Sequence, residues 1–161
     1  MDSTSSLFLT GATGQLGSFI LAELLGYGTL DRSSSPIICA KRPTSAFDQL
    51  HITAEFLGLS HDSLTSDRNV HFLDMDLTDA HHCNELLQDY CQEHNLTLPR
   101  SIIHAAASIN ISPSAKKATV SNAALTNEML LLAELLNTEH FTHISSIAVM
   151  GGSAPLGEEL L

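Results

Sequence analysis

Five short apolar runs, separated by longer segments of helical periodicity, constrain the fold of this chain of 161 residues more than any other feature. The runs are continuous rather than alternating, which is typical of strands covered on both faces. They lie at residues 7–10, 37–40, 70–73, 101–105 and 141–145. Helices are predicted between them, at residues 15–25, 43–57, 79–94 and 115–137. Strands joined by helices of this length favour right-handed crossovers, so we expect an α/β fold with a doubly wound, parallel, Rossmann-like sheet of about five strands.

The composition excludes several classes of protein. Hydrophobic residues make up 43% of the chain and charged residues 16%, which argues against intrinsic disorder. Seven Lys and Arg residues stand against 18 Asp and Glu residues, so we expect binding neither to nucleic acid nor to a membrane surface. The amino terminus has no basic region and no long apolar run, and no segment is long enough to span a bilayer. We therefore expect a cytoplasmic location.

The spacing of cysteine and histidine predicts neither a disulfide framework nor a metal site. The three cysteines are odd in number, and Cys83 and Cys91 lie on one predicted helix, about 12 Å apart by helical rise. That separation is beyond the reach of a disulfide. The nine histidines are scattered, and none pairs with a cysteine at the spacing of a zinc site. We expect no metal.

A glycine-rich loop joins the first predicted strand to the first predicted helix. Gly11 permits a tight turn, Gly14 lets a pyrophosphate approach the backbone, and Gly17 allows the helix to pack against the strand. The helix N-terminus adds unpaired N–H groups and the positive end of the helix dipole. This strand–glycine–helix order predicts a dinucleotide site. The expected cofactor-binding residues of the loop are Thr10, Gly11, Thr13, Gly14, Gln15, Leu16 and Gly17.

Two basic residues, Lys41 and Arg42, follow the second predicted strand. A site for NAD(H) usually has Asp or Glu there to bind the ribose 2′-hydroxyl, whereas a basic residue suits a 2′-phosphate. We therefore expect NADP(H) in preference to NAD(H), with Arg42 as the leading ligand of the 2′-phosphate and Lys41 as the second. The alternative is that both side chains are simply solvated beyond the end of a strand.

Further motifs resemble the extended branch of the short-chain dehydrogenase/reductase superfamily, whose TGATGxLG loop is similar to the loop above. Asp76 and Leu77 resemble the family's Asp–aliphatic pair, which implies that the carboxylate meets the adenine amino group. His104, Ala105 and Ala106 resemble its HxAA segment, which implies a place beside the nicotinamide ribose. Because His104 lies at the end of a predicted strand beside small residues, we expect it to be packed or hydrogen-bonded rather than a general base.

The same resemblance implies two catalytic positions. Asn122 is similar to the helix Asn of the family's NVxGT motif, and Ser146 is similar to its active-site Ser or Thr in SSxxVYG. The alternative for Ser146 is a strand-end residue that satisfies backbone groups. The family's Tyr-xxx-Lys acid is absent, because neither Tyr27 nor Tyr90 has Lys four residues later. We therefore expect no turnover by this chain alone.

Within that branch, the Arg42–Pro43 pair and the segment around His104 look most like NADPH-dependent thioester reductases and fatty-acyl reductases. The resemblance implies hydride transfer to a carrier-bound acyl or peptidyl thioester, with an acyl carrier protein as partner of the full-length parent. One alternative is a nucleotide-sugar epimerase or dehydratase, which typically has an acidic residue after the second strand. The other is a non-catalytic NADP-sensing interaction protein.

The resemblance also bears on domain organisation. In the family the Tyr-xxx-Lys motif comes some twenty or more residues after the Ser or Thr position, so we expect residues 1–161 to be an NADP(H)-binding domain whose carboxy-terminal part is missing. The fifth predicted strand then becomes an exposed edge. Unpaired edges invite pairing with another chain, and we expect self-association through it.

Overall fold

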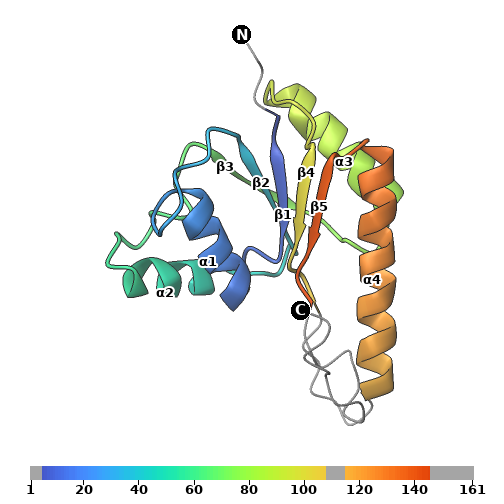
Figure 1. The fold of residues 1–161 in the computed structure, drawn as a ribbon, viewed down its shortest axis with the longest axis horizontal. Helices are drawn as coiled ribbons and strands as arrows, with labels where there is room; N and C mark the ends of the chain where they lie inside the picture. The colour runs from blue at the N-terminus through green and yellow to red at the C-terminus, as the bar shows by residue number, and fades with distance from the viewer. Residues whose placement is uncertain (1–4, 108–114, 146–161) are drawn as a thin grey trace, which may run out of the picture.

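The computed structural model describes residues 5–107 and 115–145, with side chains from residue 121 onward in the second range. Within these residues, five parallel strands form one sheet in the order β3-β2-β1-β4-β5 (Figure 1). The strands are β1 (Leu7–Thr10), β2 (Ile37–Lys41), β3 (Val70–Asp74), β4 (Ser101–His104) and β5 (His140–His143). This topology confirms the predicted doubly wound, Rossmann-like α/β fold.

Four helices cover the two faces of the sheet. They are α1 (Gln15–Leu24), α2 (Asp48–Phe56), α3 (Ala80–Glu93) and α4 (Ala115–Leu135). α1 and α2 lie on one face, and α3 and α4 lie on the other (Figure 1). Each predicted helix is present, so the alternation of apolar runs and helical segments identified the element order correctly.

One predicted helix is shorter than its periodicity suggested. The segment expected to be helical from residue 43 begins as α2 only at Asp48. Before it, the N–H of Ser45 donates to the carbonyl oxygen of Arg42 over 2.8 Å and closes a turn. Pro43 follows Arg42 in this turn, where its fixed φ suits a turn better than a helix interior.

The core has two halves, one on each side of the sheet. Phe8 and Ile38 are fully buried in the half beneath α3 and α4. Leu9 and Cys39, their neighbours along the same strands, are fully buried in the half beneath α1 and α2. Successive strand side chains point to opposite faces, so both faces need apolar residues. This explains why the strand sequences are continuous apolar runs.

The strands at the two ends of the sheet, β3 and β5, are less buried than the central strands. Among the described strands β5 pairs only with β4, and three of its four residues are exposed.

In the part of the chain that the structure describes, no helix combines the length and the apolar character needed to cross a bilayer.

Candidate functional site

The candidate site lies at the carboxyl ends of β1 and β4. The chain leaves β1 to build β2 and β3 on one side, then returns to build β4 and β5 on the other. Ligands of doubly wound sheets bind at this kind of switch point, in the crevice outside the strand ends. The glycine loop between β1 and α1 lies there (Figure 1).

At two positions of the loop, backbone atoms of the protein leave no room for a side chain, so only glycine fits. Gly11 has a φ of +77°, and a Cβ at this position would lie 2.7 Å from the carbonyl carbon of Ala105. At Gly17, a Cβ would lie 2.0 Å from the carbonyl oxygen of Gly11. Both contacts are shorter than van der Waals separation, so the loop can pass between α1 and the end of β4 only without these side chains.

Gly14 is different, because only one atom of the described residues lies close to the position of a Cβ there. It is the exposed N-cap of α1 with an extended backbone, and the nearest atom to a Cβ there is the carbonyl oxygen of Gly11 at 3.2 Å. No side chain in the described residues hydrogen-bonds to this cap. The first N–H groups of α1 therefore open onto a space that a side chain at Gly14 would fill. Such a cradle fits a phosphate, which accepts from N–H groups at the positive end of a helix.

A buried hydrogen-bond pair joins the two strands that flank this crevice. The Thr10 hydroxyl lies 2.8 Å from Nδ1 of His104, its partner in the parallel register of β1 and β4. The Thr10 oxygen also accepts the backbone N–H of Ala106 over 3.2 Å. The hydroxyl donates to Nδ1 when the ring proton of His104 is on Nε2, and it accepts from Nδ1 in the other tautomer. The pair holds Ala105 and Ala106 against the glycine loop.

His104 is a neutral side chain in this setting. Burial, with a smaller contribution from His143, lowers its pKa to about 4. The two imidazole rings stack with their centroids 5.3 Å apart. Nε2 of His104 is buried and has no hydrogen-bond partner in the part of the chain that the structure describes. The expectation that His104 is packed and hydrogen-bonded rather than a general base agrees with this environment.

At the end of β2, the two basic candidates Lys41 and Arg42 have different surroundings. The ammonium group of Lys41 forms an ion pair with Asp74 on β3 and lies 5.8 Å from the centroid of the Phe47 ring. Arg42 is exposed, and within the described ranges no ion pair or side-chain hydrogen bond engages its guanidinium. The ammonium group of Lys41 is therefore already paired with a carboxylate of the neighbouring strand, whereas the guanidinium of Arg42 is exposed to solvent.

Asp76 and Leu77 follow β3 at the same edge of the sheet. Oδ1 of Asp76 accepts the hydroxyl and the backbone N–H of Thr78, over 2.8 Å and 3.1 Å. These two hydrogen bonds lower the pKa of the exposed Asp76 carboxyl. Leu77 packs against the core beneath α3 and α4. An ionised carboxylate in a fixed orientation is able to accept a hydrogen bond from an amino group.

The remaining predicted residues divide between described and undescribed parts of the chain. Thr13, Gln15 and Leu16 lie in the loop and first turn of α1 with the glycines, Gln15 and Leu16 exposed. Asn122 lies half-buried on α4, while Ser146 lies outside the described residues. The sequence predicts Thr10 only as a cofactor-binding residue of the loop and does not predict its hydrogen bond to His104. The one indication in the sequence is that Thr10 and His104 both lie at the carboxyl end of a predicted strand.

Solved structures with the same fold come from several enzyme systems. The terminal R domain from the myxalamid PKS-NRPS biosynthetic pathway is similar with a TM-score of 0.68 and 22% identity, over 97% of this chain and 38% of that one. A thiolation-reductase di-domain from an archaeal non-ribosomal peptide synthetase gives 0.65 and 20%, over 98% and 32%. The Bordetella bronchiseptica enzyme WbmH, in complex with NAD+, gives 0.64 and 20%, over 96% and 43%. The chain thus spans less than half of each.

Comparison with curated protein sequences finds no match. The model of an NAD-binding family described as male sterility protein matches residues 9–160, which is almost the whole chain. This match agrees with the glycine loop, the open α1 N-terminus and the sheet order. The chain therefore belongs to the male sterility protein family of NAD-binding proteins and has its Rossmann-like fold.

Proposed function

We propose that this chain binds NADP(H) for a reductase that acts on carrier-bound acyl or peptidyl thioesters. The observation that carries the nucleotide part is Gly14, which leaves the N-terminus of α1 without a side-chain cap and exposed, with the carbonyl oxygen of Gly11 as the one atom close to a Cβ there. Bound there, NADPH supplies a hydride; the residues of this chain bind and orient it.

The preference for the 2′-phosphate rests on Arg42. Its exposed guanidinium follows β2 and is open, and the nearby carboxylate of Asp74 already neutralises Lys41. A guanidinium presents donors in a planar fork that matches phosphate oxygens. Arg42 is accordingly the proposed ligand of the 2′-phosphate. Lys41 is the weaker candidate, because binding a phosphate would require it to leave Asp74.

The other cofactor contacts follow the strand ends. The first N–H groups of α1 bind the pyrophosphate, the ionised carboxylate of Asp76 accepts from the adenine amino group, and the loop from His104 to Ala106 lies beside the nicotinamide ribose. Thr10 acts through His104, by holding the end of β4 in place. Asn122 and Ser146 are the proposed contacts of this chain with the reacting carbonyl region.

The thioester substrate is supported by the family match and by the likeness to reductase domains of peptide and polyketide synthetases. A nucleotide-sugar epimerase or dehydratase is the second candidate, since NAD-bound enzymes such as WbmH have the same fold. The third candidate is a non-catalytic NADP sensor.

An assay of the gene product that contains this chain separates the three. A thioester reductase oxidises NADPH when given an acyl-pantetheine thioester and releases aldehyde or alcohol. An epimerase or dehydratase instead converts a nucleotide sugar without net consumption of cofactor. A product that binds NADPH, lacks Tyr-xxx-Lys and turns over neither substrate would overturn the enzyme proposal and leave the sensor.

A further inference from the structure

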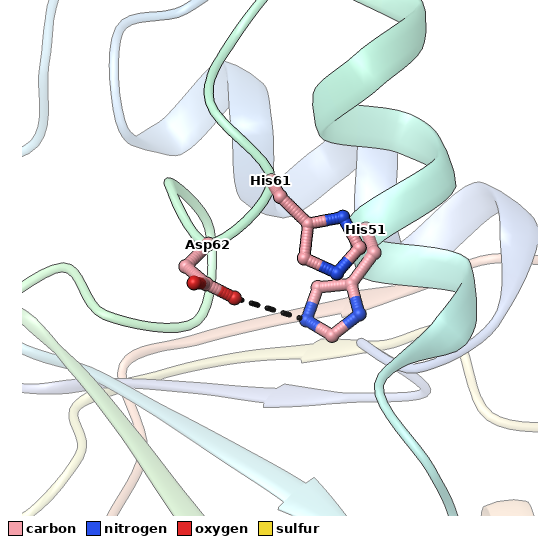
Figure 2. A group of neighbouring side chains, drawn as sticks. All are labelled: His51, His61 and Asp62. Atoms are coloured by element: carbon pink, nitrogen blue, oxygen red, sulfur yellow. Dashed lines mark ion pairs between the residues drawn. The ribbon is translucent and has the colours of Figure 1, made fainter.

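Two histidines and an aspartate converge beside α2, away from the nucleotide site (Figure 2). His51 lies on α2 and is half-buried, whereas His61 and Asp62 are exposed in the segment that follows the helix. The potential ligand atoms of the three side chains all lie within 4.8 Å of one another. Three residues from two segments therefore present nitrogen and oxygen donors to one small volume that is open to solvent.

The separations between these atoms suit a shared cation better than direct contacts. Nε2 of His51 lies 3.5 Å from Oδ1 of Asp62, which is long for a hydrogen bond. Two ligands of one tetrahedral Zn²⁺, with bonds of about 2.0–2.1 Å, lie about 3.3 Å apart. The imidazole rings of His51 and His61 stack with centroids 3.9 Å apart and planes 30° apart. Binding of one tetrahedral ion by both rings moves the centroids to about 5 Å apart, so the stack opens slightly when the ion binds.

A fourth residue orients one of the histidines. Glu55 lies one turn after His51 on α2, and its Oε1 is 3.1 Å from Nδ1 of His61. Histidines that bind metals usually donate their second ring N–H to a carboxylate or carbonyl, which fixes the tautomer and raises the basicity of the ligating nitrogen. With Nδ1 of His61 engaged by Glu55, Nε2 is left as the ligand atom. The cluster thus contains both ligands and a supporting carboxylate.

We propose that His51, His61 and Asp62 bind a divalent transition-metal ion of the Zn²⁺ type, with Glu55 positioning His61. Two imidazoles with one carboxylate suit Zn²⁺, whereas Mg²⁺ and Ca²⁺ prefer sites made of oxygen ligands. Water completes the coordination on the exposed side. The sequence did not predict this site, because ten positions separate His51 from His61 and no short zinc spacing joins them.

The metal joins α2 to the segment after it. α2 also packs on α1 through a buried hydrogen bond of 2.7 Å between the hydroxyls of Ser18 and Thr53. Near the start of α2, the Phe47 ring lies 6.5 Å from the His51 ring and faces Lys41 at the end of β2. The ion therefore stabilises α2 and the segment after it, and α2 packs on α1 and begins near the end of β2.

Titrating the whole chain with Co²⁺ and with Zn²⁺ tests the site directly. We expect one Co²⁺ per chain, with visible d–d absorption of a low-coordinate site that Zn²⁺ abolishes by displacement. His51→Ala and His61→Ala should each remove this signal, and Glu55→Gln should weaken the affinity for Zn²⁺ about tenfold while keeping the stoichiometry. His81→Ala, at an exposed position on α3, is the matched control and should bind like the wild type.

Circular dichroism of the metal-free variants checks that each is folded. We expect them to fold, because His61 is exposed and the cluster lies at the surface. The three cysteines are buried and remain in every variant, so the substitutions report on the histidines alone. Undiminished Zn²⁺ binding by both folded His→Ala variants would overturn the proposal, as would Mg²⁺ binding as tight as that of Zn²⁺. The absence of saturable Zn²⁺ binding by the wild type would also overturn it.

Discussion

The Thr10 hydroxyl and Nδ1 of His104 lie 2.8 Å apart and join the carboxyl ends of β1 and β4, which are 94 residues apart in the sequence. Both side chains are buried. The pair therefore fixes the two strand ends between which a nucleotide binds in this fold. Its position explains why two polar residues are tolerated at the end of an otherwise apolar sheet centre.

Thr10→Val tests the energetic role of this pair. The substitution keeps the shape of the side chain but leaves Nδ1 of His104 and the N–H of Ala106 without their partner. A buried polar group left unsatisfied costs about 1–3 kcal/mol, so the free energy of unfolding in urea should fall by about 2 kcal/mol. Thr142→Val, the same change at an exposed position on β5, should have almost no effect. Equal stabilities of the two variants would contradict the assigned role.

The pH dependence of stability should reveal His104. Because its pKa is lowered from 6.5 to about 4 in the folded state, chiefly by burial, the unfolded chain binds more protons between these two values. The free energy of unfolding therefore decreases as pH falls from 6.5 toward 4, by about 3 kcal/mol from this residue. His104→Asn should flatten that part of the curve measured by urea denaturation. An identical slope in wild type and variant would show that His104 is not the titrating group.

Gly14 and Gly17 should respond differently to a side chain. Gly17→Ala places a Cβ against the carbonyl oxygen of Gly11, and should destabilise the fold by roughly 3 kcal/mol or more. Gly14→Ser supplies a helix cap at an exposed position, so unfolding should change by less than about 1 kcal/mol. The same serine fills the proposed phosphate cradle, so nucleotide affinity should fall at least tenfold. Unchanged nucleotide affinity in Gly14→Ser would place the phosphates elsewhere.

These contrasts also show how much of the molecule was predictable from its sequence. Continuous apolar runs predicted β1 and β2 most directly, because these strands are covered on both faces, whereas three of the four residues of β5 are exposed. Helical periodicity predicted α1 but not its buried face: Leu16 is 55% exposed, whereas Ser18 is fully buried. The reason is the hydrogen bond between the hydroxyls of Ser18 and Thr53 on α2, and no local pattern indicates a contact between two helices.

The site was predictable to a similar extent. The glycine loop was recognised because its strand–turn–helix order is local in sequence. The sequence ranked Arg42 above Lys41 as a ligand of the 2′-phosphate, but the ion pair of Lys41 with Asp74 was not predictable, since β3 brings Asp74 alongside β2 only in the fold. The cluster of His51, His61 and Asp62 was missed for the same reason. It forms only when the segment after α2 folds back along the helix.

The edge of β5 predicts association between copies of the chain. Among the described strands it pairs only with β4, and Thr142 is one of its exposed residues. We expect light scattering to detect dimers or larger species that increase with concentration. Thr142→Lys adds a charge to the edge and should shift the population toward monomer. A wild-type chain that stays monomeric at high concentration would contradict association through β5.

Arg42→Ala should alter cofactor selectivity without affecting the fold. A hydrogen bond between charged partners contributes about 1.5–3 kcal/mol, so the affinity for NADPH should fall about tenfold or more. The affinity for NADH, which lacks the 2′-phosphate, should stay the same. Arg68→Ala, at another exposed arginine, serves as the control and should bind both cofactors like the wild type. A loss of affinity for both nucleotides in Arg42→Ala would indicate a different contact.

We propose that the α1 N-terminus and the end of β2 form a site for a phosphorylated nicotinamide dinucleotide. Calorimetric titration of the whole chain with NADPH and, separately, with NADH measures this most directly. Saturable binding of one NADPH per chain, tighter than that of NADH, is the predicted result. Binding of neither nucleotide would contradict the site itself, and equal affinity for both would contradict the role of Arg42.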